Sequence, residues 1–219
     1  MESNINNEFL INLEDDLNNM GKKVLIATLY SPDPVILATT RLGPDRIILL
    51  IDKEPNKEQE KSIKLIQDSL GKVIDVKTSK TDVYDIVEVA KKCVEIIDMQ
   101  PSEDRIFVNI TSGRKTKAIG LLFAAYARHS RVSKIAYNPE EDKSKVVYLP
   151  RLSFKLTDSQ KSILELLEKE NCGNIGDLSK KINLSTAMVY RAIDDLKDMD
   201  LVSTEDGIKL TDAGRIARL

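Results

Sequence analysis

The sequence predicts an α/β protein in which a Rossmann-like, six-stranded, mainly parallel sheet is followed by a small winged helix-turn-helix domain. Through the first 149 residues, apolar strand-like runs alternate with amphipathic helical segments, which is the pattern of a doubly wound sheet. The early strand-like runs are continuous rather than alternating, as expected for strands that are covered on both faces. After Pro150 the pattern changes to short helices and a hairpin, so we expect one domain at residues 1–150 and a second at residues 151–219.

Six apolar runs are predicted to be the strands, at residues 24–30, 47–51, 73–76, 106–110, 134–137 and 146–149. Between them, residues 58–70 and 83–97 are predicted to be helices, because their apolar residues recur at helical spacing. Residues 1–20 are rich in asparagine and carry apolar residues at helical spacing. We expect them to form a short amphipathic helix or a flexible, partly ordered tail.

The most informative stretch is residues 109–117, which read Asn-Ile-Thr-Ser-Gly-Arg-Lys-Thr-Lys between a predicted strand and an apolar helix. A helix N-terminus presents backbone N–H groups and a positive dipole end to an anion, and Arg114 and Lys115 add full charges. Hydroxyls and a close backbone approach come from Thr111, Ser112, Gly113 and Thr116. The alternative is an ordinary strand–turn–helix with a solvated basic corner.

Two phosphate-binding motifs are absent from this stretch. Neither the Walker A pattern nor the dinucleotide fingerprint occurs, so a nucleoside triphosphatase or a nicotinamide-dependent dehydrogenase has no support. The loop after the first strand, with Ser31, Pro32 and Asp33, also lies at the carboxyl end of a strand. Ligands bind there in doubly wound sheets, so both loops could line one crevice.

Residues 119–127 form a helical segment that is apolar on nearly every side. A helix without a polar face must be covered all round, and one face of a sheet cannot do that alone. A homodimer interface is the simplest cover, and burial beneath neighbouring helices is the alternative.

The C-terminal pattern is a helix with a capping box at residues 157–160, a second short helix, a turn, a third helix, a hairpin and a last short helix. This is the layout of a winged helix-turn-helix, whose helix after the turn enters the major groove of double-stranded DNA. The outward residues at the start of that helix are Ser185, Thr186, Ala187, Tyr190 and Arg191. Hydroxyls and arginine contact phosphates and bases.

The charge of this domain leaves a second function open. From Arg151 onward the chain has 11 Lys and Arg against 12 Asp and Glu, a net charge of −1, whereas DNA-binding domains are usually more basic. A winged helix that docks a protein is therefore the alternative.

The remaining composition indicates a cytoplasmic protein without a membrane partner, cofactor or metal. The acidic N-terminus lacks the cationic region of a signal peptide, and no apolar run could span a bilayer. Cys93 and Cys172 have no partner spacing and are expected to be buried, reduced thiols. The single histidine, His129, and the lack of a Cys/His cluster argue against a zinc site.

The six-stranded domain, the loop Asn109-x-Thr111-x-Gly113-Arg114-Lys115 and the C-terminal winged helix together resemble the CRISPR-associated Rossmann-fold (CARF) regulators. The resemblance covers the architecture of nearly the whole chain, although its specific motif is short. It implies a homodimer that binds a cyclic oligoadenylate, usually cyclic tetra-adenylate, across its two-fold axis. The site residues carried over are Ser31, Pro32, Asp33, Thr111, Ser112, Gly113, Arg114 and Lys115.

The sequence therefore predicts a ligand-responsive transcription regulator of a CRISPR–Cas system, with no catalytic residues. One alternative is a metal-independent ring nuclease that cleaves cyclic tetra-adenylate, with Lys115 and either Ser31 or Ser112 stabilising charge. No acid–base pair or histidine lies near the loop, so such cleavage should be slow. A protein-docking adaptor is the other alternative.

Overall fold

The computed structural model describes residues 21–142, 145–150, 152, 155–170, 174–205 and 207–219. The predictions for residues 1–20 and for Cys172 lie outside the described residues. No helix in the described part is both long enough and apolar enough to cross a membrane.

Six strands form one sheet in the order β3-β2-β1-β4-β5-β6. They are β1 (Lys23–Thr28), β2 (Arg46–Asp52), β3 (Asp75–Thr81), β4 (Arg105–Asn109), β5 (Val132–Tyr137) and β6 (Val147–Leu149). The first five run parallel and β6 is antiparallel to β5, which confirms the predicted six-stranded, mainly parallel sheet. The chain order reverses between β1 and β4, and this switch point is where doubly wound sheets bind ligands.

The third predicted strand was misplaced. The backbone N–H groups of Val73 and Ile74 donate to the carbonyl of Leu70 and end the preceding helix. The strand itself starts at Asp75 and continues through the polar residues 77–80. Because β3 is the edge strand of the sheet, much of it faces solvent and it needs no continuous apolar run.

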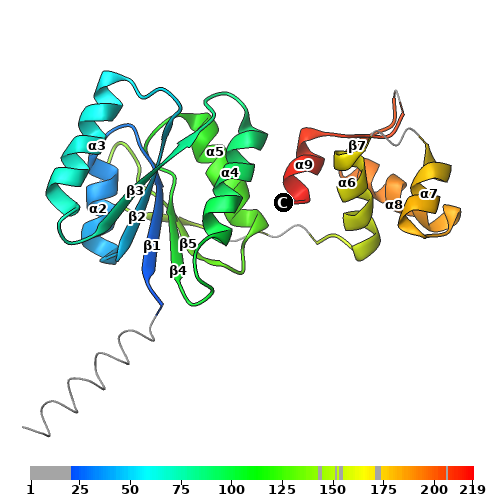
Figure 1. The fold of residues 1–219 in the computed structure, drawn as a ribbon, viewed down its shortest axis with the longest axis horizontal. Helices are drawn as coiled ribbons and strands as arrows, with labels where there is room; N and C mark the ends of the chain where they lie inside the picture. Colours follow the sequence, from blue (N-terminus) through cyan, green and yellow to red (C-terminus); the bar gives the residue numbers. More distant parts are fainter. Residues whose placement is uncertain (1–20, 143–144, 151, 153–154, 171–173, 206) are drawn as a thin grey trace, which may run out of the picture.

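Two pairs of helices cover the sheet, one pair on each face (Figure 1). The helices are α2 (Asp33–Leu42) and α3 (Lys57–Leu70) on one face, and α4 (Ile86–Asp98) and α5 (Lys115–Ala127) on the other. The predicted helix at residues 83–97 begins later than expected, because the side chain of Asp85 accepts a hydrogen bond from the N–H of Glu88 and caps α4 there.

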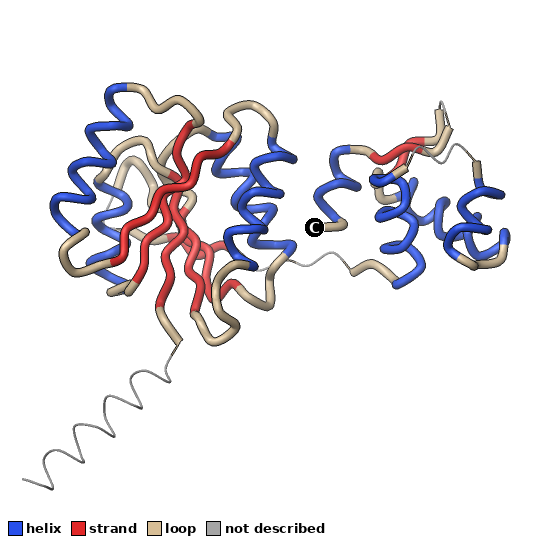
Figure 2. Tube along the Cα trace, in the orientation of Figure 1, coloured by secondary structure: helices blue, strands red, loops and turns tan. Residues whose placement is uncertain are grey.

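The C-terminal residues form four helices and a two-stranded hairpin with a core of their own. The elements are α6 (Asp158–Lys169), α7 (Ile175–Ile182), α8 (Thr186–Asp198), β7 (Val202–Ser203), β8 (Lys209–Leu210) and α9 (Asp212–Ala217). The predicted capping box of α6 is present, since Thr157 and Gln160 exchange side-chain and backbone hydrogen bonds. The core includes Ile163, Leu178, Val189 and Leu196. Figure 2 shows this helical group beyond α4 and α5, on their side away from the sheet.

Helix α9 lies between the two parts of the chain, against α4 and α5 on one side and α6 on the other (Figures 1 and 2). Its Ile216 packs with Val87 and Ala90 of α4 and with Phe123 of α5. The carboxylate of Glu168 in α6 accepts from Lys91 of α4 at 3.0 Å and from Arg218 at 3.2 Å. Apolar burial and ion pairs therefore hold the C-terminal helices to α4 and α5.

This packing accounts for the apolar character of α5. Its inner residues Leu121, Ala124 and Ala125 are buried against the sheet and α4, and Phe123 is covered by α9. Ile119 is the large apolar side chain of α5 that remains exposed. Neighbouring helices thus cover α5 within a single chain, and the helix by itself gives no reason for a dimer.

Candidate ligand-binding site

A cavity of about 680 Å³ opens at the carboxyl ends of β1, β4 and β5, at the switch point of the sheet. Of the predicted residues, Ser31, Asp33, Thr111, Ser112 and Gly113 line it. The other lining residues were not predicted, and they are Tyr30, Pro34, Leu37, Arg41, Asn138, Pro139 and Glu140. The two predicted loops therefore do line one crevice, and the loop after β5 joins them. Pro32 is the N-cap residue of α2 and is half-buried beside the cavity.

Ser112 ties the two predicted loops together. Its buried hydroxyl accepts from the N–H groups of Tyr30 and Ser31 at 2.9 and 3.0 Å, and it donates to the carbonyl of Ser31 at 3.3 Å. A serine hydroxyl has one donor and two acceptor positions. All three are used within the protein, so this side chain fixes the shape of the cavity and has no hydrogen-bonding capacity left for a ligand.

Thr111 joins the loop after β4 to the loop after β5. Its hydroxyl accepts from the N–H of Asn138 at 2.9 Å and donates to the amide oxygen of Asn138 at 3.2 Å. The amide of buried Asn109 donates to the same oxygen, and its own oxygen accepts from the N–H of Thr111. Asn138 directly follows the fifth strand, and that position is the signal by which the sequence could have indicated it.

The loop also carries backbone donors that are unused, and two of their residues, Ser112 and Gly113, line the cavity. The N–H groups of Ser112, Gly113 and Arg114 donate to none of the described residues, and no side chain caps the N-terminus of α5. Gly113 has φ +92°, and a Cβ there would lie 3.3 Å from the Cβ of Thr28. The glycine therefore allows both the turn and the close approach to β1, and the unused N–H groups make this loop a candidate anion cradle.

The other predicted residues lie on the far side of the loop, toward β2 and β3. The Nε of Arg114 donates to Asp52 at 3.2 Å, and its guanidinium lies over the ring of Tyr84 at 5.9 Å. The hydroxyl of Thr116 donates to the carbonyl of Val83 at 2.5 Å. Lys115 is exposed at the first position of α5 and does not line the cavity. The predicted residues of the loop after β4 thus occupy its two sides, with Thr111, Ser112 and Gly113 at the cavity and Arg114, Lys115 and Thr116 away from it.

A buried ion pair, which the sequence analysis missed, supports the loop from beneath. The ammonium group of Lys117 is fully buried and forms a salt bridge with Asp52, whose side chain is 9% exposed. The helical spacing in the sequence could have indicated that Lys117 is buried, because Lys117, Leu121 and Ala124 lie at positions i, i+4 and i+7. That spacing places the lysine on the inward face of α5.

The two members of this pair respond differently to burial. Burial tends to raise the pKa of Asp52, but the bonds and charges of Lys117 and Arg114 outweigh it and lower that pKa. Burial dominates at Lys117 and lowers its pKa, although Asp52 opposes the shift. Opposite charge thus keeps Asp52 ionised.

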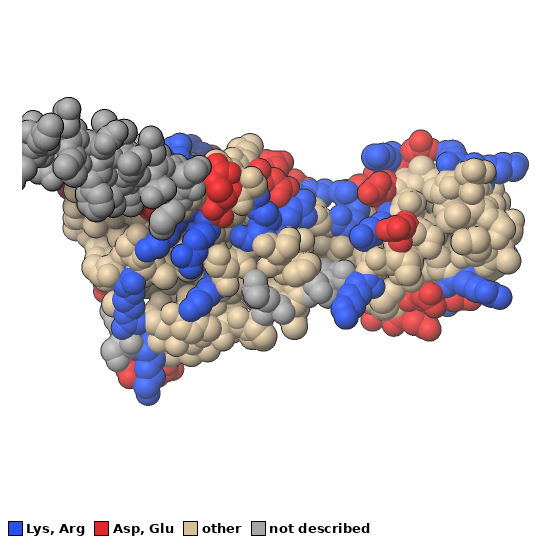
Figure 3. Space-filling view, turned by 90° about the horizontal axis from the view of Figure 1, so that it is seen from below, with Lys and Arg blue, Asp and Glu red and all other residues tan. Residues whose placement is uncertain are grey.

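The predicted DNA-contact residues lie together at the start of α8. Ser185 caps the helix by accepting from the N–H of Met188 at 3.3 Å, and Thr186, Tyr190 and Arg191 are exposed beside it. The turn before α8 is fixed by Asn183, which has φ +53°. Figure 3, which shows one face of the molecule, has Lys and Arg interspersed with Asp and Glu over this part of the chain, without a continuous basic stripe.

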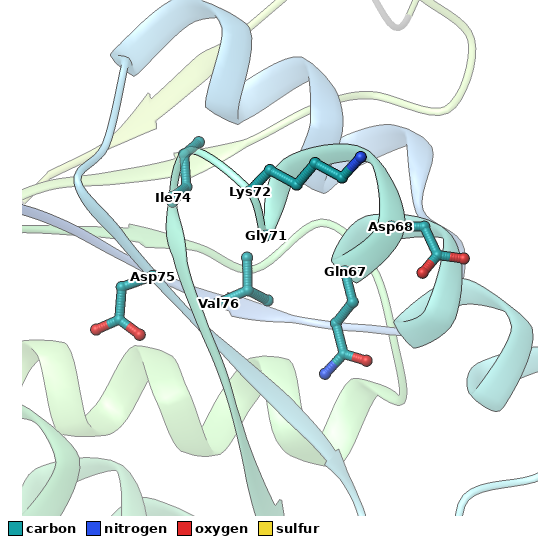
Figure 4. Close-up of a pocket in the computed structure, with 7 residues that line it drawn as sticks. All are labelled: Gln67, Asp68, Gly71, Lys72, Ile74, Asp75 and Val76. Atoms are coloured by element: carbon teal, nitrogen blue, oxygen red, sulfur yellow. The ribbon is translucent and has the colours of Figure 1, made fainter.

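A second hollow, of about 620 Å³, lies at the end of α3 and the start of β3 (Figure 4). Its Gln67, Asp68 and Lys72 side chains point apart, and Asp75 pairs with Arg46. It is at the amino end of the strands and has no converging polar groups, so it lacks the features of a ligand site. Among the described residues no group of three or more His, Cys, Asp or Glu could hold a metal ion. Cys93 is a buried free thiol, as predicted, and burial raises its pKa to about 12.

A family profile described as "HFX_2341_N:-like, N-terminal" matches residues 23–142. No curated protein sequence matches the chain. Among solved structures, Can2 from Sulfobacillus thermosulfidooxidans in complex with cyclic tetra-adenylate is 16% identical with a TM-score of 0.48, over 89% of this chain and 63% of that one. VC1899 from Vibrio cholerae is 12% identical with a TM-score of 0.47, over 90% of this chain and 64% of that one.

Csm6 from Enterococcus italicus, bound to cyclic hexa-2'-fluoro-hexa-dAMP, is 15% identical with a TM-score of 0.45, over 82% of this chain and 55% of that one. This chain therefore spans less than two thirds of the length of each of these three structures.

Proposed function

We propose a function for this chain from the premise that it belongs to the "HFX_2341_N:-like, N-terminal" family: it is a ligand-responsive, DNA-binding regulator of a CRISPR–Cas system. Residues 1–150 form a CARF-like sensing domain that binds a cyclic oligoadenylate, with cyclic tetra-adenylate the first choice. Residues 151–219 form a winged helix-turn-helix that binds double-stranded DNA.

The observation that carries the ligand proposal is the set of unused N–H groups at Ser112, Gly113 and Arg114, beside a cavity at the switch point. Such a cradle suits a phosphodiester. The apolar part of the cavity wall, with Tyr30, Pro34 and Leu37, suits a flat base. One chain offers this cradle once, and a ring of linked nucleotides has several equivalent phosphates, which favours a two-fold assembly.

The dimer that we propose uses the open half of the sheet rather than α5. On the face that α2 covers, strand register places Phe107, Lys134, Ala136 and Tyr148 side by side. Among the described elements α2 packs on β1, and the helix that packs on β5 is α5, on the opposite face. Tyr148 is 55% exposed, and the ammonium of Lys134 lies 4.9 Å from its ring centroid.

A second copy of the chain is the occupant that this open face fits. The groove between α2 and strands β4 to β6 shares Leu37, Arg41 and Asn138 with the cavity. A two-fold mate on that groove would bring the two cavities to the dimer axis, where one cyclic ligand could touch both.

The DNA proposal rests on the start of α8, where Thr186, Tyr190 and Arg191 are exposed and the acidic residues lie further along the helix. With a net charge of −1 for residues 151–219, long-range attraction to DNA is weak. Contacts from these few residues must then supply most of the affinity.

The ring-nuclease alternative has less support from the geometry. It needs an ammonium group and a free hydroxyl beside the ligand, but Lys115 does not line the cavity and the hydroxyl of Ser112 is fully engaged. Of the residues considered for cleavage, Ser31 lines the cavity, and Ser112 bonds its backbone rather than its hydroxyl.

Calorimetry with cyclic tri-, tetra- and hexa-adenylate tests the ligand, with linear tetra-adenylate as the control. We expect one ring per two chains for the preferred size and weak binding of the linear form. No binding of any ring would overturn the ligand proposal. Product analysis after long incubation tests the nuclease alternative, for which appearance of linear product is the deciding result.

DNA binding is tested by gel shifts on the promoter of the chain's own gene. Arg191→Ala should cost about 1–3 kcal/mol if Arg191 reads a base, or lower the salt slope by about one if it holds a phosphate. Lys161→Ala removes an exposed charge from α6 and should change little. Equal binding by wild type and Arg191→Ala would favour a protein-docking role.

A further inference from the structure

We infer that Asp52 and Lys117 are positioning residues that hold Arg114 in place while leaving its guanidinium free to bind a phosphodiester. This inference rests on the proposed function, because it concerns the same loop. Arg114 does not line the cavity, so the phosphodiester that it would bind lies beside the cavity at the N-terminus of α5. The two positioning residues do not line the cavity either. Three side chains support this inference, namely Asp52 at the end of β2, Arg114 at the N-cap of α5 and Lys117 within α5.

The first step concerns charge balance beneath the loop. The Asp52 carboxylate, at the end of β2, contacts the Lys117 ammonium through Oδ1 and the Arg114 Nε through Oδ2. Lys117 is 0% exposed, so it can serve no partner in solvent. Because Lys117 by itself neutralises the Asp52 carboxylate, the positive charge of Arg114 is not needed to balance it.

The second step concerns the geometry of Arg114. One bond from Nε and one ring contact, to Tyr84 at 5.9 Å, fix the guanidinium plane. The two Nη groups donate to none of the described residues, and the side chain is 46% exposed. Paired terminal N–H groups on a fixed guanidinium match two phosphate oxygens.

The third step follows from removing one charge. Without Lys117, Asp52 would be a buried carboxylate whose remaining cation is Arg114, and the guanidinium would be drawn onto it through its Nη groups. The arginine would then be unavailable to a ligand. Removing Asp52 together with Lys117 takes away both charges and should release Arg114 again.

The test is a set of variants read by calorimetry with cyclic tetra-adenylate and, separately, with inorganic pyrophosphate. Lys117→Met should weaken binding about tenfold or more, as should Arg114→Ala. The double variant Asp52→Asn/Lys117→Met should recover to within about threefold of wild type. Lys117→Met added to Arg114→Ala should have no further effect, because the lysine acts through the arginine.

The matched control is Lys53→Met, which breaks the exposed Lys53–Asp82 pair next to the same loop. It changes the local charge by the same amount without touching Arg114, so binding should stay within about threefold of wild type. Circular dichroism and thermal unfolding show that each variant is folded. If Lys117→Met does not fold, Asp52→Asn/Lys117→Met against Arg114→Ala still decides, since only the former should bind well.

The inference is overturned if folded Lys117→Met binds like wild type, if the double variant binds as weakly as Arg114→Ala, or if Lys53→Met is as damaging as Lys117→Met. The two probes separate this inference from the proposed function. If wild type binds pyrophosphate in the expected variant order but no cyclic ring, the proposed ligand is wrong and the inference stands. If wild type binds neither probe, both fail.

Discussion

Gly113 shows how a single residue shapes the cradle. Its φ of +92° lies in the region that favours glycine, and the position of a Cβ would be 3.3 Å from the Cβ of Thr28 and 3.4 Å from the carbonyl oxygen of Leu29. Backbone strain and contact with β1 would therefore act together on any side chain placed there.

We expect Gly113→Ala to lower the free energy of unfolding by about 1–3 kcal/mol, measured by urea denaturation. Gly43→Ala is the matched control, since Gly43 has φ +54° but no atom within 4 Å of its Cβ position. That variant should cost about 1–2 kcal/mol from conformation alone. A smaller loss at position 113 than at position 43 would show that the loop moves away from β1 freely.

At the scale of elements, the close packing of α4 on α5 depends on another glycine. A Cβ at Gly120 would lie 2.5 Å from Cγ1 of Val89. Such contacts force helices apart, and overpacking costs about 1–3 kcal/mol. We therefore expect Gly120→Ala to be destabilising, although alanine is normally the better helix former.

The partner substitution makes this prediction specific. Val89→Ala alone should destabilise the protein by leaving a cavity. The double variant Val89→Ala/Gly120→Ala should lose less stability than the sum of the two single-variant losses. Urea unfolding of the four proteins measures the coupling. Additive losses would mean that the two residues do not meet.

The elements also show what sequence reasoning could reach. The strands β1, β2 and β4 were predicted well because each is a continuous apolar run that is buried on both faces. The polar edge strand β3 was misplaced, because partial exposure removes the signal on which the prediction depended. The apolar helix α5 was correctly predicted to be covered, but its cover depends on how α9 returns to it, which no local pattern encodes.

The site divides in the same way. Ser31, Asp33 and Thr111 follow predicted strands, so the carboxyl-end rule was enough to place them at the cavity. Arg41 comes from the last turn of α2, and its place at the cavity depends on the packing of that helix. The two sides of the loop at residues 111–116 could not be told apart before the position of Asp52 was known.

At the scale of the whole molecule, assembly and the docking of the C-terminal helices are the features to test. If the dimer forms through the open sheet face, Tyr148→Asp should give a monomer in sedimentation equilibrium at micromolar concentration. Ile119→Asp, at the exposed residue of α5, should leave the dimer intact. If Ile119→Asp instead gives a monomer and Tyr148→Asp leaves the dimer intact, the interface is at α5. A monomeric wild type would contradict both surfaces.

Glu168 links α6 to α4 and α9 through Lys91, Arg215 and Arg218. Burial tends to raise the pKa of Glu168, but these cations outweigh it and lower the pKa below its ordinary 4.5. A lowered folded pKa gives stability that is complete above that ordinary value and is lost as the pH falls through the folded one.

We therefore expect Glu168→Gln to cost about 1–2 kcal/mol at neutral pH and to flatten the fall of stability below pH 4.5. Urea unfolding across pH measures both effects, with Glu165→Gln, at an exposed position on α6, as the control. If the free energy of unfolding of wild type and of Glu168→Gln changes with pH in parallel, the Glu168 carboxylate does not stabilise this contact.

The position of α9 also bears on how the chain is made. The apolar surface of Val87, Ala90 and Phe123 leaves the ribosome well before Ile216, which covers it. At about 5–20 residues per second, that surface stays bare for roughly 5–20 seconds in every round of synthesis. Nascent chains that stall in this interval would present a ready binding surface to chaperones. We therefore expect codon choice downstream of α5 to alter the yield of native protein.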